Sequence, residues 1–372
     1  MIKHLRYFLS PFILLITIWA VLKGNYYPLA FIISFDVLVA LGDAFLKQDT
    51  ELMDNPSPGI LNLALYLNLP LLYIVLSLSI FVLTDFNPGW YISLWNYFNI
   101  DIIQSRANTT FVDMIALILY AIPLHVSTMG TNVGHELTHR KRENFDMFVG
   151  NWLLALSWDC TFAIEHVYGH HKNVGLKGDP ATASRDESLY MFIIRGTIKA
   201  HKDAWKIEID RLKRTSNFPF SLKNRMIQGY MRSLFLCFMA FTIGSYMGLL
   251  IFLLWGLIAK SYLETINFIE HYGLVRVPGE PVFPRHSWNS NHVVSSSLLY
   301  NLNRHSSHHE KTNLRYWELK SYPDAPTLPH GYLFCLYIAF FAPPLFKRMM
   351  KPKLEEWDQK FASDAERKLI AG

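Results

Sequence analysis

The chain has 372 residues, of which 51% are hydrophobic, and its mean hydropathy is positive. Apolar residues in long runs at this density are typical of integral membrane proteins and argue against a pair of soluble domains. The formal net charge of +5 is modest, so the position of the charges is more informative than their sum.

In chain order, the apolar runs predict an all-α membrane protein with six transmembrane helices. The spans are expected at about residues 7–22, 28–46, 60–84, 111–131, 229–245 and 247–267. The last two come from one run of nearly 40 residues, which as a single helix would be about 60 Å long, twice the thickness of a bilayer core. The turn between them is expected at "GSYMG", residues 244–248, which also matches the close-packing motif GxxxG.

Two further apolar segments are expected to lie at the interface or re-enter without crossing. Residues 147–164 include Asp159, and residues 331–346 include Pro343 and Pro344. The N-terminus has no signal-peptide cleavage pattern and leads directly into the first apolar segment.

Positive charge predicts the orientation. The expected outer loops, 23–27, 85–110 and the turn near 246, carry only Lys23 and Arg106, whereas residues 132–228 carry fifteen Lys and Arg. Basic loops stay on the cytoplasmic side, so both termini and the segments 132–228 and 268–372 are expected there, as a cytosolic helical cap on a single domain, 1–372.

Eight of the fifteen histidines fall in three clusters, and a ninth stands in "NFIEHYGL". The nine are His135 and His139; His166, His170 and His171; His305, His308 and His309; and His271. Helical residues three or four apart share a face, so each cluster offers a pair of imidazoles for one ion, and an adjacent histidine can reach a second. Two alternatives to metal binding are a lone buried histidine that is hydrogen-bonded and a solvated histidine tract. The histidines here occur in clusters that are interrupted by apolar and acidic residues at helical spacing, which disfavours both alternatives.

The predicted topology is consistent with one site, because six spans bring all the clusters to the same side of the membrane. A single helix over 229–267 would instead place His271 on the opposite side.

Three functional classes are consistent with the histidines. "HELTH", residues 135–139, matches the HExxH motif of zinc metalloproteases, in which Glu136 would be the general base. Eight or nine imidazoles exceed what one zinc uses and favour two first-row metals, of which iron is the redox-active choice. A proton-relaying transporter is disfavoured because the clusters lie at or beyond the predicted helix ends.

The motifs "NVGHELTHRK", "EHVYGHHKNVGLKGDPATASR", "NFIEHYGLVR", "HSWNSNH" and "LNRHSSHHE" resemble the integral-membrane diiron hydroxylases and desaturases. Within that group the chain is most similar to alkane 1-monooxygenases, with the xylene monooxygenase hydroxylase component a near relative. The resemblance implies six transmembrane helices, a bacterial inner-membrane location, two non-haem irons and O₂ as co-substrate. It also implies that all nine histidines named above are the iron ligands, and that no separate protein nucleophile acts.

The activity implied is hydroxylation of the terminal methyl group of medium-chain alkanes to primary alcohols, and the alternative is methyl hydroxylation of toluene or xylenes. "DPATASR" and "HSWNSNH" look like the alkane enzymes, whereas the tail at 351–369 is closer to xylene monooxygenase. Cys160, Cys237 and Cys335 form no CxxC pair, so electrons are expected from another protein. The resemblance implies a rubredoxin- or ferredoxin-type carrier with its reductase. No nucleic-acid partner is expected.

Nearby carboxylates are expected to support the ligands. Glu136, Glu165, Glu270 and Glu310 each adjoin a candidate ligand in sequence, and Asp179 follows in "GDPA". A carboxylate that accepts a ligand N–H fixes the ring's tautomer and raises its basicity, although Glu310 is equally consistent with an ordinary surface residue. His286 and His292, in "HSWNSNH", are left out of the metal shell and given a supporting role.

Two basic segments, "HRKR" at 139–142 and residues 206–225, have two interpretations. They either set topology and contact anionic lipid, or they dock an acidic electron carrier.

Overall fold

The computed structural model describes residues 2–371, which form helices and no strand apart from two isolated β-bridges. Five helical stretches within this part are long and apolar enough to cross a membrane: Lys3–Lys23, Tyr27–Phe45, Pro58–Val82, Phe111–Thr138 and Arg225–His271. The prediction of an all-helical chain with membrane-spanning segments is therefore confirmed.

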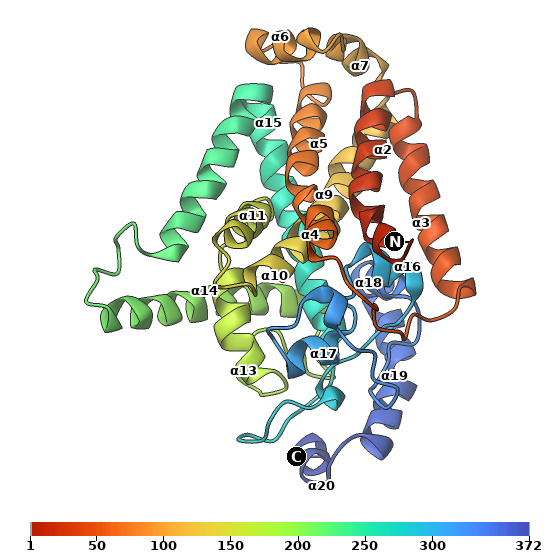
Figure 1. Cartoon of the computed structure of the whole chain (residues 1–372), viewed down its shortest axis with the longest axis vertical. Helices are drawn as coiled ribbons and strands as arrows, with labels where there is room; N and C mark the ends of the chain where they lie inside the picture. The colour runs from red at the N-terminus through yellow and green to blue at the C-terminus, as the bar shows by residue number, and fades with distance from the viewer. Residues whose placement is uncertain (1, 372) are drawn as a thin grey trace.

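The first four stretches are built from consecutive helices. Their bounds are α1 (Ile2–Leu5), η1 (Arg6–Phe8), α2 (Leu9–Lys23), α3 (Tyr27–Phe45), α4 (Pro58–Tyr66), α5 (Asn68–Val82), α8 (Phe111–Ala116), η2 (Leu117–Ala121), α9 (Ile122–His125), η3 (Val126–Thr131) and α10 (Asn132–Thr138). Helix α2 packs against α3 and α5, and α6 (Gly89–Tyr97) and α7 (Ile102–Asn108) lie across one end of this bundle (Figure 1).

The fifth stretch, α15 (Arg225–His271), consists of two arms joined at Ser245, where φ is 55° and ψ is −153°. The arms meet at this break and diverge from it in a V-shaped hairpin (Figure 1). A Cβ on Gly248 would lie 2.7 Å from the Ala240 carbonyl oxygen, so glycine is needed where the arms approach. The "GSYMG" segment thus contains both a turn and a close helix contact, the two interpretations that its sequence allowed.

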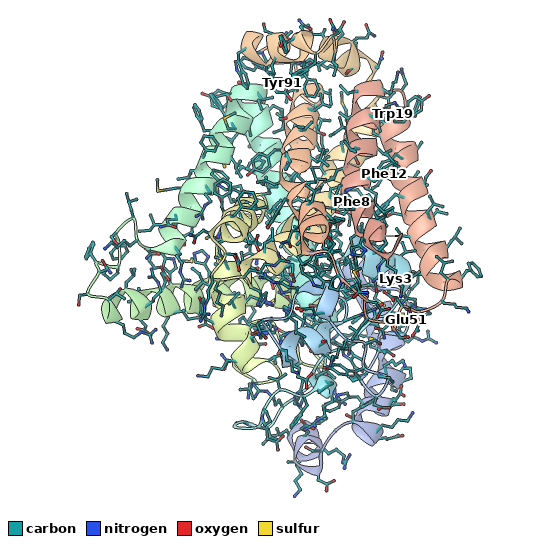
Figure 2. The ribbon with its side chains drawn as sticks, viewed as in Figure 1. Lys3, Phe8, Phe12, Trp19, Glu51 and Tyr91 are labelled. Atoms are coloured by element: carbon teal, nitrogen blue, oxygen red, sulfur yellow. The ribbon has the colours of Figure 1, made fainter. Side chains whose placement is uncertain are left out.

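The outer surface of the bundle is apolar. Phe12 and Trp19 of α2 are 58% and 47% exposed, and Figure 2 shows them along this helix together with Phe8. On the second arm of α15, Leu257 is 65% exposed. Apolar side chains in such numbers on long helices fit a lipid environment. Lys3, at the end of the bundle opposite Tyr91, forms an ion pair with Glu51 (Figure 2).

The remaining elements gather at the end of the bundle away from α6 and α7 (Figure 1). They are α11 (Asn144–Ala155), α12 (Phe162–Glu165), η4 (His166–His170), α13 (His171–Asn173), α14 (Leu189–Arg214), η5 (Pro284–His286), α16 (Val293–Leu298), α17 (His305–Glu310), η6 (Tyr316–Glu318), α18 (Tyr332–Phe341), α19 (Pro343–Lys360) and α20 (Asp364–Ala371). The apolar helices α11 and α18 have 12 and 10 residues, too few to cross a bilayer.

Candidate metal centre

The first histidine pair extends a candidate membrane span. His135 lies in α10 and His139 directly follows it, and their ring centroids are 5.0 Å apart, as expected for residues one helical turn apart. Helix α11 packs closely behind them. A Cβ on Gly134 would lie 3.0 Å from the Gly150 carbonyl oxygen, so two glycines allow the helices to approach at backbone distance.

The second cluster does not pair as its spacing predicts. His166 and His170 are four positions apart, yet the His166 Nε2 atom lies 3.1 Å from Nε2 of His171. His170 instead lies in a separate group of histidines with His271, His305 and His309. The reason is that η4 is a π-helix, which closes i to i+5 rather than i to i+4. The expectation that residues four apart share an ion is wrong for this cluster.

Helix α17 supplies both groups. His305 and His309 face the same group, with their Nε2 atoms 2.9 Å apart, whereas the His308 Nε2 atom lies 2.8 Å from Nε2 of His135. His271, the last residue of α15, places its Nε2 atom 3.0 Å from that of His305.

All nine predicted histidines therefore converge in two groups. One holds His135, His139, His166, His171 and His308, and the other holds His170, His271, His305 and His309; within each group the candidate ligand atoms lie within 4.8 Å of one another. All are buried except His139, which is partly exposed.

The histidines suit metal ions. Burial, followed by repulsion from neighbouring imidazoles, lowers the pKa of His166, His171, His305 and His309 well below the usual value. The rings are therefore neutral, which is the metal-binding form. Nitrogens bound to one metal at about 2.0–2.1 Å lie about 3 Å from one another, as several do here. Among the described residues, His170 Nε2 and both ring nitrogens of His139 have no hydrogen-bond partner.

Two carboxylates contact candidate ligands. Asp179 Oδ2 lies 2.9 Å from His170 Nδ1 and accepts a hydrogen bond from the Thr182 hydroxyl at 2.6 Å. Glu270 Oε1 lies 3.3 Å from His305 Nδ1, a contact that falls short of hydrogen-bond geometry, and accepts from Tyr332. Neither Thr182 nor Tyr332 stands out in the sequence, although Thr182 follows Asp179 by three residues.

The other three predicted carboxylates have different surroundings. Glu136 is buried and accepts from Arg140 at 2.7 Å and from the backbone N–H of Tyr316. Glu310 is exposed and accepts from the Tyr322 hydroxyl. Glu165 is buried beside Gly169, and within the described chain it makes no hydrogen bond to a histidine ring.

Comparison with known proteins agrees with this geometry. The fatty acid desaturase family model matches residues 109–339, more than half of the chain, and this segment contains all nine histidines. The chain belongs to the fatty acid desaturase family. The resemblance seen in the histidine motifs is thereby confirmed.

Several proteins that are similar in sequence to this chain are named as monooxygenases. Alkane 1-monooxygenase 1 of Alcanivorax borkumensis is 39% identical over 62% of the chain and 58% of that protein. Alkane 1-monooxygenase of Ectopseudomonas oleovorans is 36% identical over 62% of the chain and 59% of that protein. The xylene/toluene monooxygenase hydroxylase component XylM of Pseudomonas putida is 28% identical over 98% of the chain and 93% of that protein. The chain thus spans less than two thirds of the length of these two alkane relatives.

A small cavity adjoins the histidines of this desaturase-family chain. It has a volume of about 20 Å³, room for roughly one water molecule, and touches His135 and His166. Phe162 stacks on the His166 ring with centroids 4.3 Å apart. The other apolar lining residues are Leu263, Ile266, Leu299 and Leu302, and Ser127, Thr131, Asn132, Asn267, Glu270, Asn303 and Tyr332 are the polar ones.

A wider, open groove of about 400 Å³ lies beside His139. Its lining residues are His139, Arg140, Lys141, Arg142, Glu143, Thr312, Asn313, Leu314 and Arg315. This groove reaches the one candidate ligand that is partly exposed.

Proposed function

We propose that this protein is an oxygen-dependent hydroxylase that converts the terminal methyl group of medium-chain alkanes to a primary alcohol at a non-haem diiron centre. The observation that carries the proposal is the pair of adjacent groups of five and four histidines. Two redox-active ions suit these ligand sets better than one zinc, which takes four ligands. Iron bound there would supply dioxygen activation, and all nine histidines would be its ligands.

The residues of the small cavity support this proposal. Ser127 lies eight residues before His135 on one candidate span, about 12 Å away from it along the helix axis. Leu263 lies eight residues before His271 on another candidate span. A hydrocarbon entering between these helices from the bilayer brings its end to His135 and His166. Phe162, Leu263 and Leu299 would form the apolar part of the wall, and the cavity would have to widen to admit a methyl group, because its volume of about 20 Å³ suits one water molecule.

The alternative substrate class is an alkylbenzene. The relative named for xylene and toluene aligns with 98% of the chain, whereas the alkane relatives align with about 62% but at higher identity. Membranes containing the protein, a carrier and its reductase would be given equal octane and para-xylene in air. Mainly 1-octanol supports the alkane assignment, and mainly methylbenzyl alcohol overturns it.

The zinc protease alternative is weakened by the surroundings of Glu136. Its Oε1 atom accepts from Arg140 and from Tyr316 N–H, and the buried ion pair with Arg140 disfavours a role as general base. Metal analysis separates the classes: about two irons per chain support the hydroxylase, and one zinc with no iron overturns it.

We also propose six spans with the histidine-bearing end in the cytoplasm. The two arms of α15, separated at Ser245, would each cross the membrane, and the count of basic residues would then follow the positive-inside rule. His271, at the end of the second arm, would emerge beside the other clusters.

An acidic carrier of the rubredoxin or ferredoxin type is proposed to dock in the groove beside His139. Arg315 lies 3.6 Å from Glu143 and Arg140 pairs with Glu136, but Lys141 and Arg142 form no ion pair among the described residues. Such unpaired cations speed encounter with an acidic protein. Charge reversal of Lys141 and Arg142 should slow carrier-dependent turnover at low salt, whereas reversal of Lys213 and Arg214 in the second basic segment should not. Turnover insensitive to both the first reversal and ionic strength would contradict this docking site.

A further inference from the structure

We propose that Glu366, in the C-terminal helix α20, is a positioning residue for the metal centre and acts through His286 on His271. The inference rests on the proposed metal centre, but it concerns a segment that lies beyond the residues matched by the family model, which end at 339.

Glu366 is held firmly at the start of α20. Its side chain is fully buried, and Oε2 accepts from the Ser363 backbone N–H at 2.7 Å while the Ser363 hydroxyl accepts from the Glu366 N–H at 3.2 Å. This reciprocal pair is a capping box, which fixes the carboxylate relative to the helix. Oε2 also accepts from Arg285 Nε at 2.9 Å. A buried carboxylate is costly unless it is paired in this way.

The hydrogen bonds of His286 determine its tautomer. The Phe283 backbone N–H donates to His286 Nδ1 at 3.0 Å, so Nδ1 carries no proton. Nε2 therefore carries it and donates to Glu366 Oε1, 2.7 Å away. Both nitrogens of this fully buried ring are engaged, so the ring and its backbone have one orientation.

The backbone of His286 then orients a candidate ligand. Its carbonyl oxygen lies 3.2 Å from His271 Nδ1 and accepts that N–H. His271 therefore presents the lone pair of Nε2 to the group of four, where it lies 3.0 Å from His305 Nε2. Outer partners of this kind orient metal-bound histidines and raise their basicity. The chain of contacts explains why His286 is buried next to the centre without being a ligand.

Metal binding by full-length protein in nanodiscs tests this inference. Glu366→Ala should weaken binding of one of the two ions about 10- to 100-fold, so iron falls from about two towards one per chain. Glu366→Gln keeps an acceptor for His286 Nε2–H and should restore most of the second ion. Glu356→Ala is the control in the tail, because Glu356 of α19 pairs with Lys353 and Lys360 at 3.1 and 3.0 Å and makes no hydrogen bond to His286 or His271 among the described residues.

Equal losses in Glu366→Ala, Glu366→Gln and Glu356→Ala would mean that the C-terminal tail has only a structural role and would overturn the inference. Unchanged affinity for both ions in Glu366→Ala would do the same. A wild-type protein that binds fewer than two metal ions would instead overturn the proposed function on which the inference rests.

Discussion

The Nε2 atoms of His166 and His171 lie 3.1 Å apart, and the two residues are five positions apart in the sequence. The π-helix between them makes this contact and turns His170 towards the other group. Adjacent residues of one motif therefore lie in two groups, and the peptide bond between His170 and His171 joins the groups.

This arrangement predicts which double variants remove one ion and which remove two. His170→Ala with His271→Ala changes one group only and should leave about one metal per chain. His170→Ala with His171→Ala changes both groups and should lower both. Iron content of purified protein measures this, and equal losses in the two double variants would contradict the division into groups.

Asp179→Asn should lower iron affinity about 10- to 100-fold, because the amide keeps an acceptor for the His170 Nδ1–H but loses the negative charge that raises the basicity of this ligand. Competition with a chelator measures the change. Glu187→Gln is a suitable control, since Glu187 pairs with Arg195 at 2.6 Å. A larger effect in the control than in Asp179→Asn would argue that the loop fold, rather than His170, is responsible.

Gly256→Ala should destabilise the protein by about 1–3 kcal/mol, because a Cβ there would overlap the indole of Trp158. Gly59→Ala in α4 should have no such effect, since nothing lies within 4 Å of its added Cβ, and alanine's helix propensity favours it by up to about 1 kcal/mol. Thermal unfolding in detergent compares the two. Similar melting temperatures for the two variants would contradict the close packing of α15 against Trp158.

The proposed topology predicts the labelling of two exposed sites. Tyr246→Cys, beside the break in α15, should react with an impermeant maleimide added outside intact cells, because Tyr246 is 74% exposed. Phe220→Cys, 67% exposed between α14 and α15, should react only after the membrane is opened. Cells with the wild-type protein give the background labelling of the three native cysteines. Labelling of both sites, or of neither, from outside would contradict two crossings by α15.

Much of the centre is predictable from the sequence, because histidine clusters on helices and long apolar runs are local signals. The same holds for the break at Ser245, since the length of the apolar run demands a turn. The pairing of His166 with His171 is not predictable from spacing, because an α-helix and a π-helix differ by one residue per turn. Nor is the contact of Glu366 with His286, because it joins residues 80 positions apart through tertiary packing.

The measurement that tests the central claim most directly uses ¹⁸O₂. Iron-loaded protein with carrier, reductase and octane should form 1-octanol that contains one ¹⁸O atom, and a protein without its histidine ligands should form none. Absence of labelled alcohol from octane and from para-xylene, with two irons bound and the carrier reduced, would contradict the assignment as a hydroxylase.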